Sequence, residues 1–384
     1  VDGIKYWDIG QGSYLTDGKA GMSSGKSVTE RLFSFFARAN YSYQDKYMLS
    51  ASIRHEGSSK FAADNRWANF WSATAGWRIS NEEFMKDFDW LDDLKIRFGY
   101  GVTGNNDFSA TYMANMLGSD TNWMMPNGTW AYSYGKSQNV NPNLGWEEKK
   151  EWNLGVDYSF FEGRLYGKFD YYRREVDNLL FSVKVPQPPY TQGSQMQNIG
   201  SMESKGWEFE VGGDIIRTKD FTWSSSMNLS HNTGKILTLE GDNSYHNGNG
   251  FVAPGTPGDA ARMEAGSTIG SFYMWKFAGF DDEGSFLLYN KDGEVIPAAQ
   301  KTENDKQYIG NYTPKLIIGW SHTLTYKNFD LGINLRSWID FDVYNTINMY
   351  YGIQGQGNLN VLKDAYGKFN HIKGEKQICD YFLE

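Results

Sequence analysis

Repeated alternation of apolar and polar residues is the feature of this sequence that most restricts its fold. Between residues 93 and 103, Leu94, Ile96 and Phe98 alternate with Lys95 and Arg97. Similar runs recur at 46–56, 151–160, 206–215, 220–230, 316–326 and 329–339. Because successive side chains of a strand point to opposite faces, each run predicts a strand with one apolar and one polar face. A soluble antiparallel sandwich would alternate in the same way.

The length and spacing of the runs favour a transmembrane β-barrel over that sandwich. Strands that cross a bilayer need roughly 9 to 11 residues, whereas strands of globular sheets commonly have about 5 or 6. The runs have the crossing length. Tight turns are predicted at 44–46, 162–164, 218–220 and 327–329, and long excursions at 104–144, 177–202 and 234–311. Short turns at one end and long loops at the other are typical of bacterial outer-membrane barrels.

Ten crossings are predicted from the alternation and the turns. They are 31–43, 46–57, 67–79, 93–103, 145–160, 164–176, 203–216, 220–233, 312–326 and 328–341. Since consecutive crossings run in opposite directions, residues 234–311 must lie outside or contribute an even number of crossings. We interpret 269–289 as an external hairpin rather than a wall strand. After residue 345 the alternation fades, so 346–384 is predicted to be an extracellular loop.

Composition excludes several other classes of protein. The mean hydropathy of −0.59 is compatible with a barrel, because only every second residue of a barrel strand faces lipid. A net charge of −9 disfavours nucleic acid as a partner. The five histidines show no zinc-ligand spacing and no hydrolase motif is present, so we predict no enzyme, no catalytic or metal site and no cofactor. Cys379, the one cysteine, cannot close an intrachain disulfide.

The ten crossings are expected to be part of a larger wall. A closed barrel leaves no unpaired strand edge in lipid, yet the sequence starts without a secretory segment and stops in a predicted loop. We therefore interpret residues 1–345 as a partial barrel whose closure is missing.

Several motifs resemble the C-terminal half of the SusC/RagA-like group of TonB-dependent outer-membrane transporters of Bacteroidetes. They are FARANY at 36–41, RHEGSSKF at 54–61, GWRISNEEF at 76–84, LKIRFGYG at 94–101, NPNLGWE at 141–147, NIG at 198–200, GSFY at 270–273, IGN at 309–311 and DVYN at 342–345. The resemblance implies a barrel of about 22 strands with an internal plug. It also implies energy coupling through TonB, a SusD-like surface lipoprotein as a lid, and uptake of oligosaccharides or peptides.

The sequence also departs from the family pattern. The plug, the segment that binds TonB and the last barrel strands have no counterpart here. Glu56 stands where the family usually has Asp, and Lys60 where it often has Arg. The missing parts imply that this chain alone would not transport a substrate.

Two groups of candidate site residues follow from the predicted wall and loops. Charged residues expected to face the lumen are Arg38, Arg54, Lys95, Arg97, Glu208, Glu210, Asp330 and Arg336. Loop aromatics that could stack on substrate or contact the lid are Trp123, Trp130, Tyr132, Tyr134 and Tyr190. For these rings we favour the plainer interpretation that they pack the loops together or contact the lid.

Other motifs have ordinary interpretations. Arg54 to Phe61 suits a turn at the outer end of a strand, and the alternative is an anion or sugar contact through Arg54 and His55. Asn290 to Glu294 resembles part of a calcium loop, but an Asp-Gly hairpin turn is the better interpretation.

Ile96→Arg is predicted to cost roughly 2 to 4 kcal/mol if Ile96 lies near the bilayer midplane.

Two other functions remain open from the sequence. A passive porin would have the same wall but no energy coupling, and a plug and TonB-binding segment on the same gene would exclude it. A secreted β-sandwich adhesin would be recovered in buffer without detergent.

Overall fold

The computed structural model describes residues 13–14, 20–21, 30–109, 112, 117–124, 126–128, 130–136, 138–239, 246–247, 260–282, 285–351, 360, 362–363, 369–372 and 376–379. The chain forms two compact units, Val1–Glu203 and Ser204–Glu384. Within the ranges just given, no helix is both long and apolar enough to cross a membrane.

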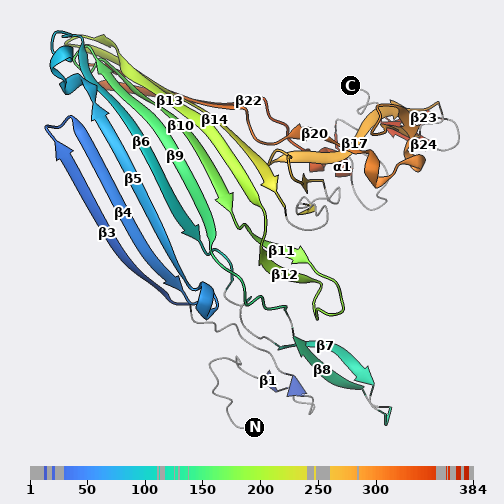
Figure 1. The fold of residues 1–384 in the computed structure, drawn as a ribbon. Coiled ribbons are helices and arrows are strands. Elements are labelled where there is room, and N and C mark those ends of the chain that lie inside the picture. The colour runs from blue at the N-terminus through green and yellow to red at the C-terminus, as the bar shows by residue number, and fades with distance from the viewer. Residues whose placement is uncertain are drawn as a thin grey trace. The chain divides into compact units, whose positions relative to one another are not determined.

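Ten strands form the main sheet, in the order β22-β21-β14-β13-β10-β9-β6-β5-β4-β3 (Figure 1). Those of the first unit are β3 (Leu32–Tyr43), β4 (Tyr47–Ser58), β5 (Trp67–Arg78), β6 (Leu91–Asn105), β9 (Glu147–Phe160) and β10 (Leu165–Asp177). Strand β13 (Ser201–Arg217) begins in the first unit, and β14 (Phe221–Thr238), β21 (Leu316–Tyr326) and β22 (Phe329–Ile339) belong to the second. All ten predicted crossings are confirmed as strands. The largest differences are that β14 extends to Thr238 and that β21 starts at Leu316 instead of 312.

Tight turns join these strands at the predicted places. Gln44 and Asp45 have φ values of 50° and 53°, both positive as in a type I′ turn, and the Lys46 amide donates to the Tyr43 carbonyl at 2.9 Å. At the turn between β9 and β10, the Asp92 carboxylate accepts from the backbone amides of Glu162 and Gly163 at 3.0 and 2.9 Å. A side chain of the neighbouring strand therefore fixes this turn.

The register divides the first unit's sheet into an apolar face and a polar face. One row across the six strands consists of Tyr41, Leu49, Ala75, Phe98, Leu154 and Tyr171. The adjacent row, on the other face, consists of Asn40, Ser50, Thr74, Gly99, Asn153 and Tyr172. Leu49, Phe98 and Leu154 are each 43 to 53% exposed, so no second layer of the described chain covers the apolar face there.

The second unit has the same two faces. Met227, Trp320 and Leu335 form an apolar row across β14, β21 and β22, and Ser226, Ser321 and Asn334 form the adjacent polar row. Alternation within β14, β21 and β22 therefore matches the sequence prediction residue by residue.

The apolar face ends at an aromatic pair next to the tight turns. Tyr47 and Trp77 are cross-strand partners, and both donate to Glu82 in the link between β5 and β6, at 2.7 and 3.0 Å. These hydrogen bonds, with a third from Lys46, lower the pKa of Glu82 from 4.5 to about 2. Ile96 lies directly opposite Trp77. Ile96 thus lies beside the aromatic pair, and Leu154, opposite Phe98, lies two residues further from it, so arginine is expected to cost more at Leu154 than at Ile96.

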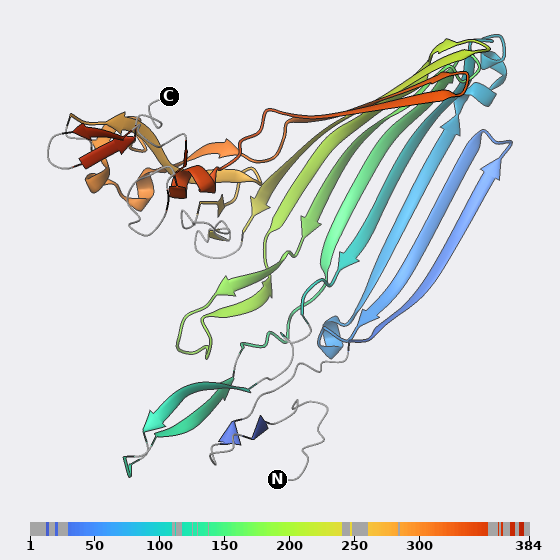
Figure 2. The same ribbon diagram turned by 180° about the vertical axis from the view of Figure 1, so that it is seen from behind.

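The long excursions contain small sheets of their own. The first excursion carries the hairpin β7 (Leu117–Met124) and β8 (Trp130–Lys136), and the second carries β11 (Leu180–Lys184) and β12 (Ser194–Asn198) (Figure 2). A four-stranded sheet in the second unit orders as β19-β18-β17-β20, with β17 (Ser271–Phe280), β18 (Phe286–Tyr289), β19 (Val295–Pro297) and β20 (Lys306–Asn311). The segment 269–289 is therefore a hairpin outside the main sheet. This agrees with the interpretation from the alternating directions of the predicted crossings.

The turn between β18 and β19 is the predicted Asp-Gly hairpin turn. The Asn290 amide donates to the Glu294 carbonyl at 2.8 Å, and Gly293 has a φ of 84°. The Asn290 side-chain oxygen accepts from the amides of Asp292 and Glu294, so this oxygen serves the turn.

Residues 346–384, predicted as loop, contain regular structure. They include a short helix α1 (Thr346–Tyr351) and a hairpin of β23 (Phe369–Ile372) and β24 (Lys376–Cys379). These short elements were not predicted, because strands of four residues with polar Asn370, His371 and Gln377 leave no alternation long enough to detect, and the extracellular loop stays a prediction.

Candidate functional site

The polar face of the first unit brings together four of the predicted charged residues. Arg38 lies opposite Ser52, Arg54 lies opposite Phe36 and Phe70, and Lys95 lies opposite Asp157. Arg97 is two residues from Lys95 on β6 and shares its face. The register alone therefore gathers these cations on one side of the sheet.

Arg97 is held by two carboxylates from the neighbouring strands. Its Nε and Nη2 donate to Asp157 on β9 at 2.7 and 2.8 Å, and its Nη2 lies 3.2 Å from both carboxylate oxygens of Asp170 on β10. Gly155 leaves room for the guanidinium, since a Cβ there would come within 2.6 Å of Nη2. The position of Arg97 is thus fixed and its charge is compensated by two aspartates, so it is not a free cation for a ligand.

A hollow of about 520 Å³ lies beside Arg97 on the polar face. Amide and hydroxyl groups of Asn40, Ser50, Thr74 and Asn153 line it, and the glycines at 76 and 99 add no side-chain bulk. Among the described residues, the Lys95 ammonium at this hollow makes no hydrogen bond or ion pair. The hollow therefore offers one cation and several neutral hydrogen-bonding groups to a polar solute.

Arg54 and His55 have protein partners at the outer end of β4. Arg54 Nη2 lies 2.7 Å from Glu56 Oε1, and His55 Nδ1 lies 2.7 Å from Asn69 Oδ1 while its ring stacks on Trp67 at 4.7 Å. These contacts favour the structural interpretation of this motif over an anion or sugar contact.

The turn predicted within this motif begins later than expected. Gly57 and Ser58 still belong to β4, and the chain leaves the sheet only at Ser59. Gly57 is required by packing instead of by a turn, because a Cβ at Gly57 would come within 2.7 Å of the Trp67 ring.

The second unit carries the other predicted charged residues. Asp330 Oδ1 accepts from Thr325 Oγ1 at 2.7 Å, and the Arg336 guanidinium lies 5.2 Å from the Trp338 ring centre. Both share the polar face with Ser321 and Asn334. Asp214 accepts a hydrogen bond from Ser224 on the polar face of β14. Glu208 and Glu210 are separated from Asp214 by even numbers of positions on β13, so their side chains share its face. All four are therefore assigned to the polar face of the second unit.

The predicted loop aromatics lie in the two hairpins of the first unit. The β7–β8 register pairs Trp123 with Ala131 and Tyr132 with Asn122, and the backbones of Trp130 and Tyr134 belong to β8. The side chains of these four lie outside the described residues. Tyr190 is half-buried near the tip of the β11–β12 excursion, where its amide donates to the Pro186 carbonyl at 3.3 Å.

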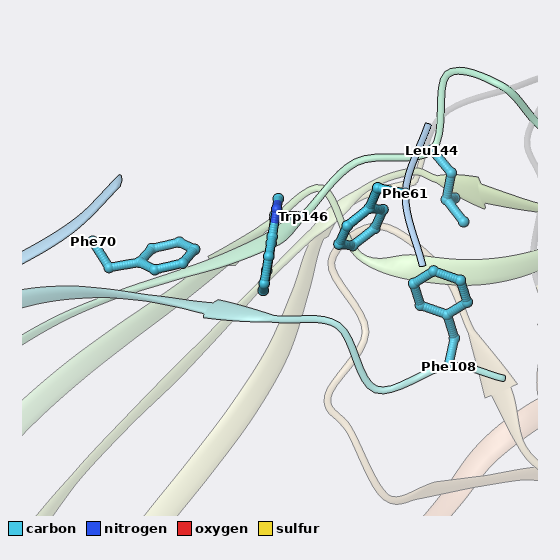
Figure 3. Packing of buried hydrophobic residues seen from close by; sticks show 5 residues of the cluster. All are labelled: Phe61, Phe70, Phe108, Leu144 and Trp146. Atoms are coloured by element: carbon cyan, nitrogen blue, oxygen red, sulfur yellow. The ribbon is translucent and has the colours of Figure 1, made fainter. Parts of the chain in front are cut away.

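A buried cluster beneath the loops was not predicted from the sequence. Figure 3 shows the Trp146 ring between Phe70 and Phe61, at ring-centre distances of 5.3 and 5.0 Å. Phe108 and the fully buried Leu144 complete the cluster. A Cβ at Gly104 would come within 2.0 Å of Phe70, so only glycine fits there. The NPNLGWE motif, which includes Leu144 and Trp146, was the signal available in the sequence.

An antiparallel sheet of long strands with one apolar and one charged face defines an outer-membrane barrel wall. The family model described as "TonB dependent receptor-like, beta-barrel" matches residues 3–345. The chain belongs to the TonB-dependent receptor family, as part of its β-barrel in the outer membrane, and it is SusC/RagA-like within that family.

The similar sequences are longer receptors. The chain is 34% identical to the TonB-dependent receptor SusC of Bacteroides thetaiotaomicron, over 85% of this chain and 33% of the receptor. It is 33% identical to TonB-dependent receptor P3 of Formosa agariphila, over 82% of this chain and 32% of that receptor. The chain thus spans about a third of the relatives it matches.

Solved structures of a related complex match the fold. The RagAB peptide transporter gives a TM-score of 0.68 at 28% identity, covering 84% of this chain and 35% of the matched chain. The RagAB peptide importer in its "closed-closed" state gives 0.70 at 27% identity, covering 86% of this chain and 36% of the matched chain.

Proposed function

We propose that this chain forms nearly half of the barrel wall of an energy-coupled importer that takes up oligosaccharides or peptides at the cell surface. In this proposal the lid is a SusD-like lipoprotein, and TonB supplies the energy for uptake. The role of the chain is to line the transport path, and no catalytic step is assigned to it.

The observation that carries this proposal is the segregation of charge across the sheet. Arg97, Asp157 and Asp170 on the polar face would be costly in hydrocarbon, whereas Leu49, Phe98 and Leu154 on the other face suit it. We therefore assign the apolar face to lipid and the polar face, with all eight predicted charged residues, to the lumen. The hollow beside Lys95 would then be a polar contact along the path.

The assignment of the two faces can be tested with neighbouring residues of β4. Leu49→Cys and Ser50→Cys, each with Cys379 replaced by Ser in the complete transporter, are labelled with bimane and reconstituted in lipids brominated on their acyl chains. The Leu49→Cys label is expected to be quenched strongly and the Ser50→Cys label little, because their side chains point to opposite faces. Equal quenching of the two labels would contradict the assignment.

Energy-coupled uptake can be tested in cells that carry the complete gene. Labelled oligosaccharide and peptide mixtures are offered to cells with and without TonB, and with and without the neighbouring lipoprotein gene. We expect one of the two mixtures to be accumulated only when TonB and the lipoprotein are both present. Accumulation that does not depend on TonB would favour the passive porin.

A further inference from the structure

The two long excursions of the first unit are tied together by side-chain amides. We call Asn139, Asn141, Gln192, Gln195 and Asn198 the amide ladder. Their side chains hydrogen-bond backbone groups of the opposing segment, between residues 136–145 on one side and 191–198 on the other. The ladder adds to a parallel backbone bridge between Asn139 and Gln195, which by itself is too short to form a pair of strands.

Asn139 is the most completely bonded member of the ladder. Its Nδ2 donates to the carbonyls of Gln192 and Ser194 at 2.7 and 2.9 Å. Its Oδ1 accepts from Thr191 Oγ1 and from the Gln192 amide at 3.1 and 3.3 Å. Asn139 is only 8% exposed, so its own buried amide depends on these four partners for its hydrogen bonds.

Asn198 closes the other end of the ladder. Its Oδ1 accepts from the Gly145 amide at 2.7 Å and its Nδ2 donates to the Gly145 carbonyl at 2.9 Å. Gly145 lies between Leu144 and Trp146, so the ladder continues into the buried aromatic cluster. The β11–β12 hairpin is therefore anchored at its tip by Asn139 and at its base by Asn198.

We propose that the amide ladder joins the two excursions into one composite loop, and that Asn139 is a positioning residue for the tip that carries Tyr190. Residues 191–194 follow Tyr190 directly, and Asn139 binds three of them. The composite loop also connects Tyr190 with the hairpin that carries Trp130 and Tyr132. The role of Tyr190 in substrate contact rests on the proposed function, whereas the joining of the loops does not.

The test compares three variants of the complete transporter by hydrogen–deuterium exchange mass spectrometry in micelles. Asn139→Ala and the isosteric Asn139→Asp, which loses both donors, should speed exchange roughly tenfold or more in peptides covering 136–142 and 185–198. The matched control is Asn143→Ala, because the exposed Asn143 side chain makes no hydrogen bond among the described residues. Unchanged exchange in the Asn139 variants, or faster exchange on one side only, would overturn the composite loop.

The positioning of Tyr190 has a separate readout in cells. With whichever labelled mixture the cells accumulate, Asn139→Ala should raise the half-saturating concentration severalfold without lowering the maximal rate. In the Asn139→Ala background, Tyr190→Ala should then raise the half-saturating concentration only a little further. Additive effects of the two substitutions would refute the positioning role. If neither mixture is accumulated, the proposed function fails, and the exchange experiment still decides whether the loops are joined.

Discussion

Leu154→Arg is expected to destabilise the membrane-embedded transporter by up to roughly 2 to 4 kcal/mol, because it places a cation in the hydrocarbon beside the apolar face. Leu154 lies on β9 in the row with Leu49, Ala75 and Phe98, and it is 43% exposed. The measurement is a guanidinium titration of the complete transporter in liposomes, followed by circular dichroism.

Two neighbouring positions serve as controls for Leu154→Arg. Asn153→Arg lies at the same depth on the polar face, and we expect a change within about 0.5 kcal/mol. Ile96→Arg, opposite Trp77 and two residues nearer the aromatic pair, should cost less than Leu154→Arg. A penalty for Asn153→Arg as large as that for Leu154→Arg would contradict the assignment of the faces.

Trp146→Ala is expected to cost roughly 3 to 5 kcal/mol in the stability of the composite loop. The ring is 8% exposed, and its Nε1 donates to the Arg66 carbonyl at 3.1 Å. Removing it leaves a cavity between Phe61 and Phe70 and takes away one of the two hydrogen bonds to the Arg66 carbonyl, which the Ser58 amide also reaches at 3.1 Å. Hydrogen–deuterium exchange in peptides covering 59–66 and 106–112 measures the loss.

The conservative variant separates packing from hydrogen bonding at this position. Trp146→Phe keeps most of the ring but loses the donor, so it should cost only about 1 to 3 kcal/mol. Asn143→Ala, three residues away and exposed, should have no effect on these peptides. Equal effects of Trp146→Ala and Trp146→Phe would show that the hydrogen bond, not the packed ring, stabilises the loop.

The wall strands could be predicted from the sequence because apolar and polar residues alternate along them with a period of two. Strand β4 has lipid-type residues at Leu49 and Ile53 and polar ones at Ser50 and Ser52, and a shift by one residue would reverse both sets. The same periodicity placed Asp330 and Arg336 on one face of β22. The turn at Gln44 was found because a change of direction must separate two such runs.

The features that escaped prediction depend on contacts between residues from different segments, and these contacts follow no repeating pattern in the sequence. The amide of Asn139 reaches residues about 53 positions away in the sequence, and nothing in the local pattern marks it. Gly57 by its residue type suits a turn, whereas its actual requirement comes from the Trp67 ring on the adjacent strand, which the local sequence does not reveal. Phe108 and Leu144 are 36 positions apart in the sequence and come together only in the folded cluster.

The triad of Arg97, Asp157 and Asp170 has a consequence for how the wall assembles. It links three consecutive strands of the sheet, β6, β9 and β10, through a single guanidinium. If β6 slipped by one residue against β9, Arg97 would turn toward the acyl chains and leave two aspartates without their counterion. The triad thus penalises misaligned insertion and selects the correct pairing as the barrel forms.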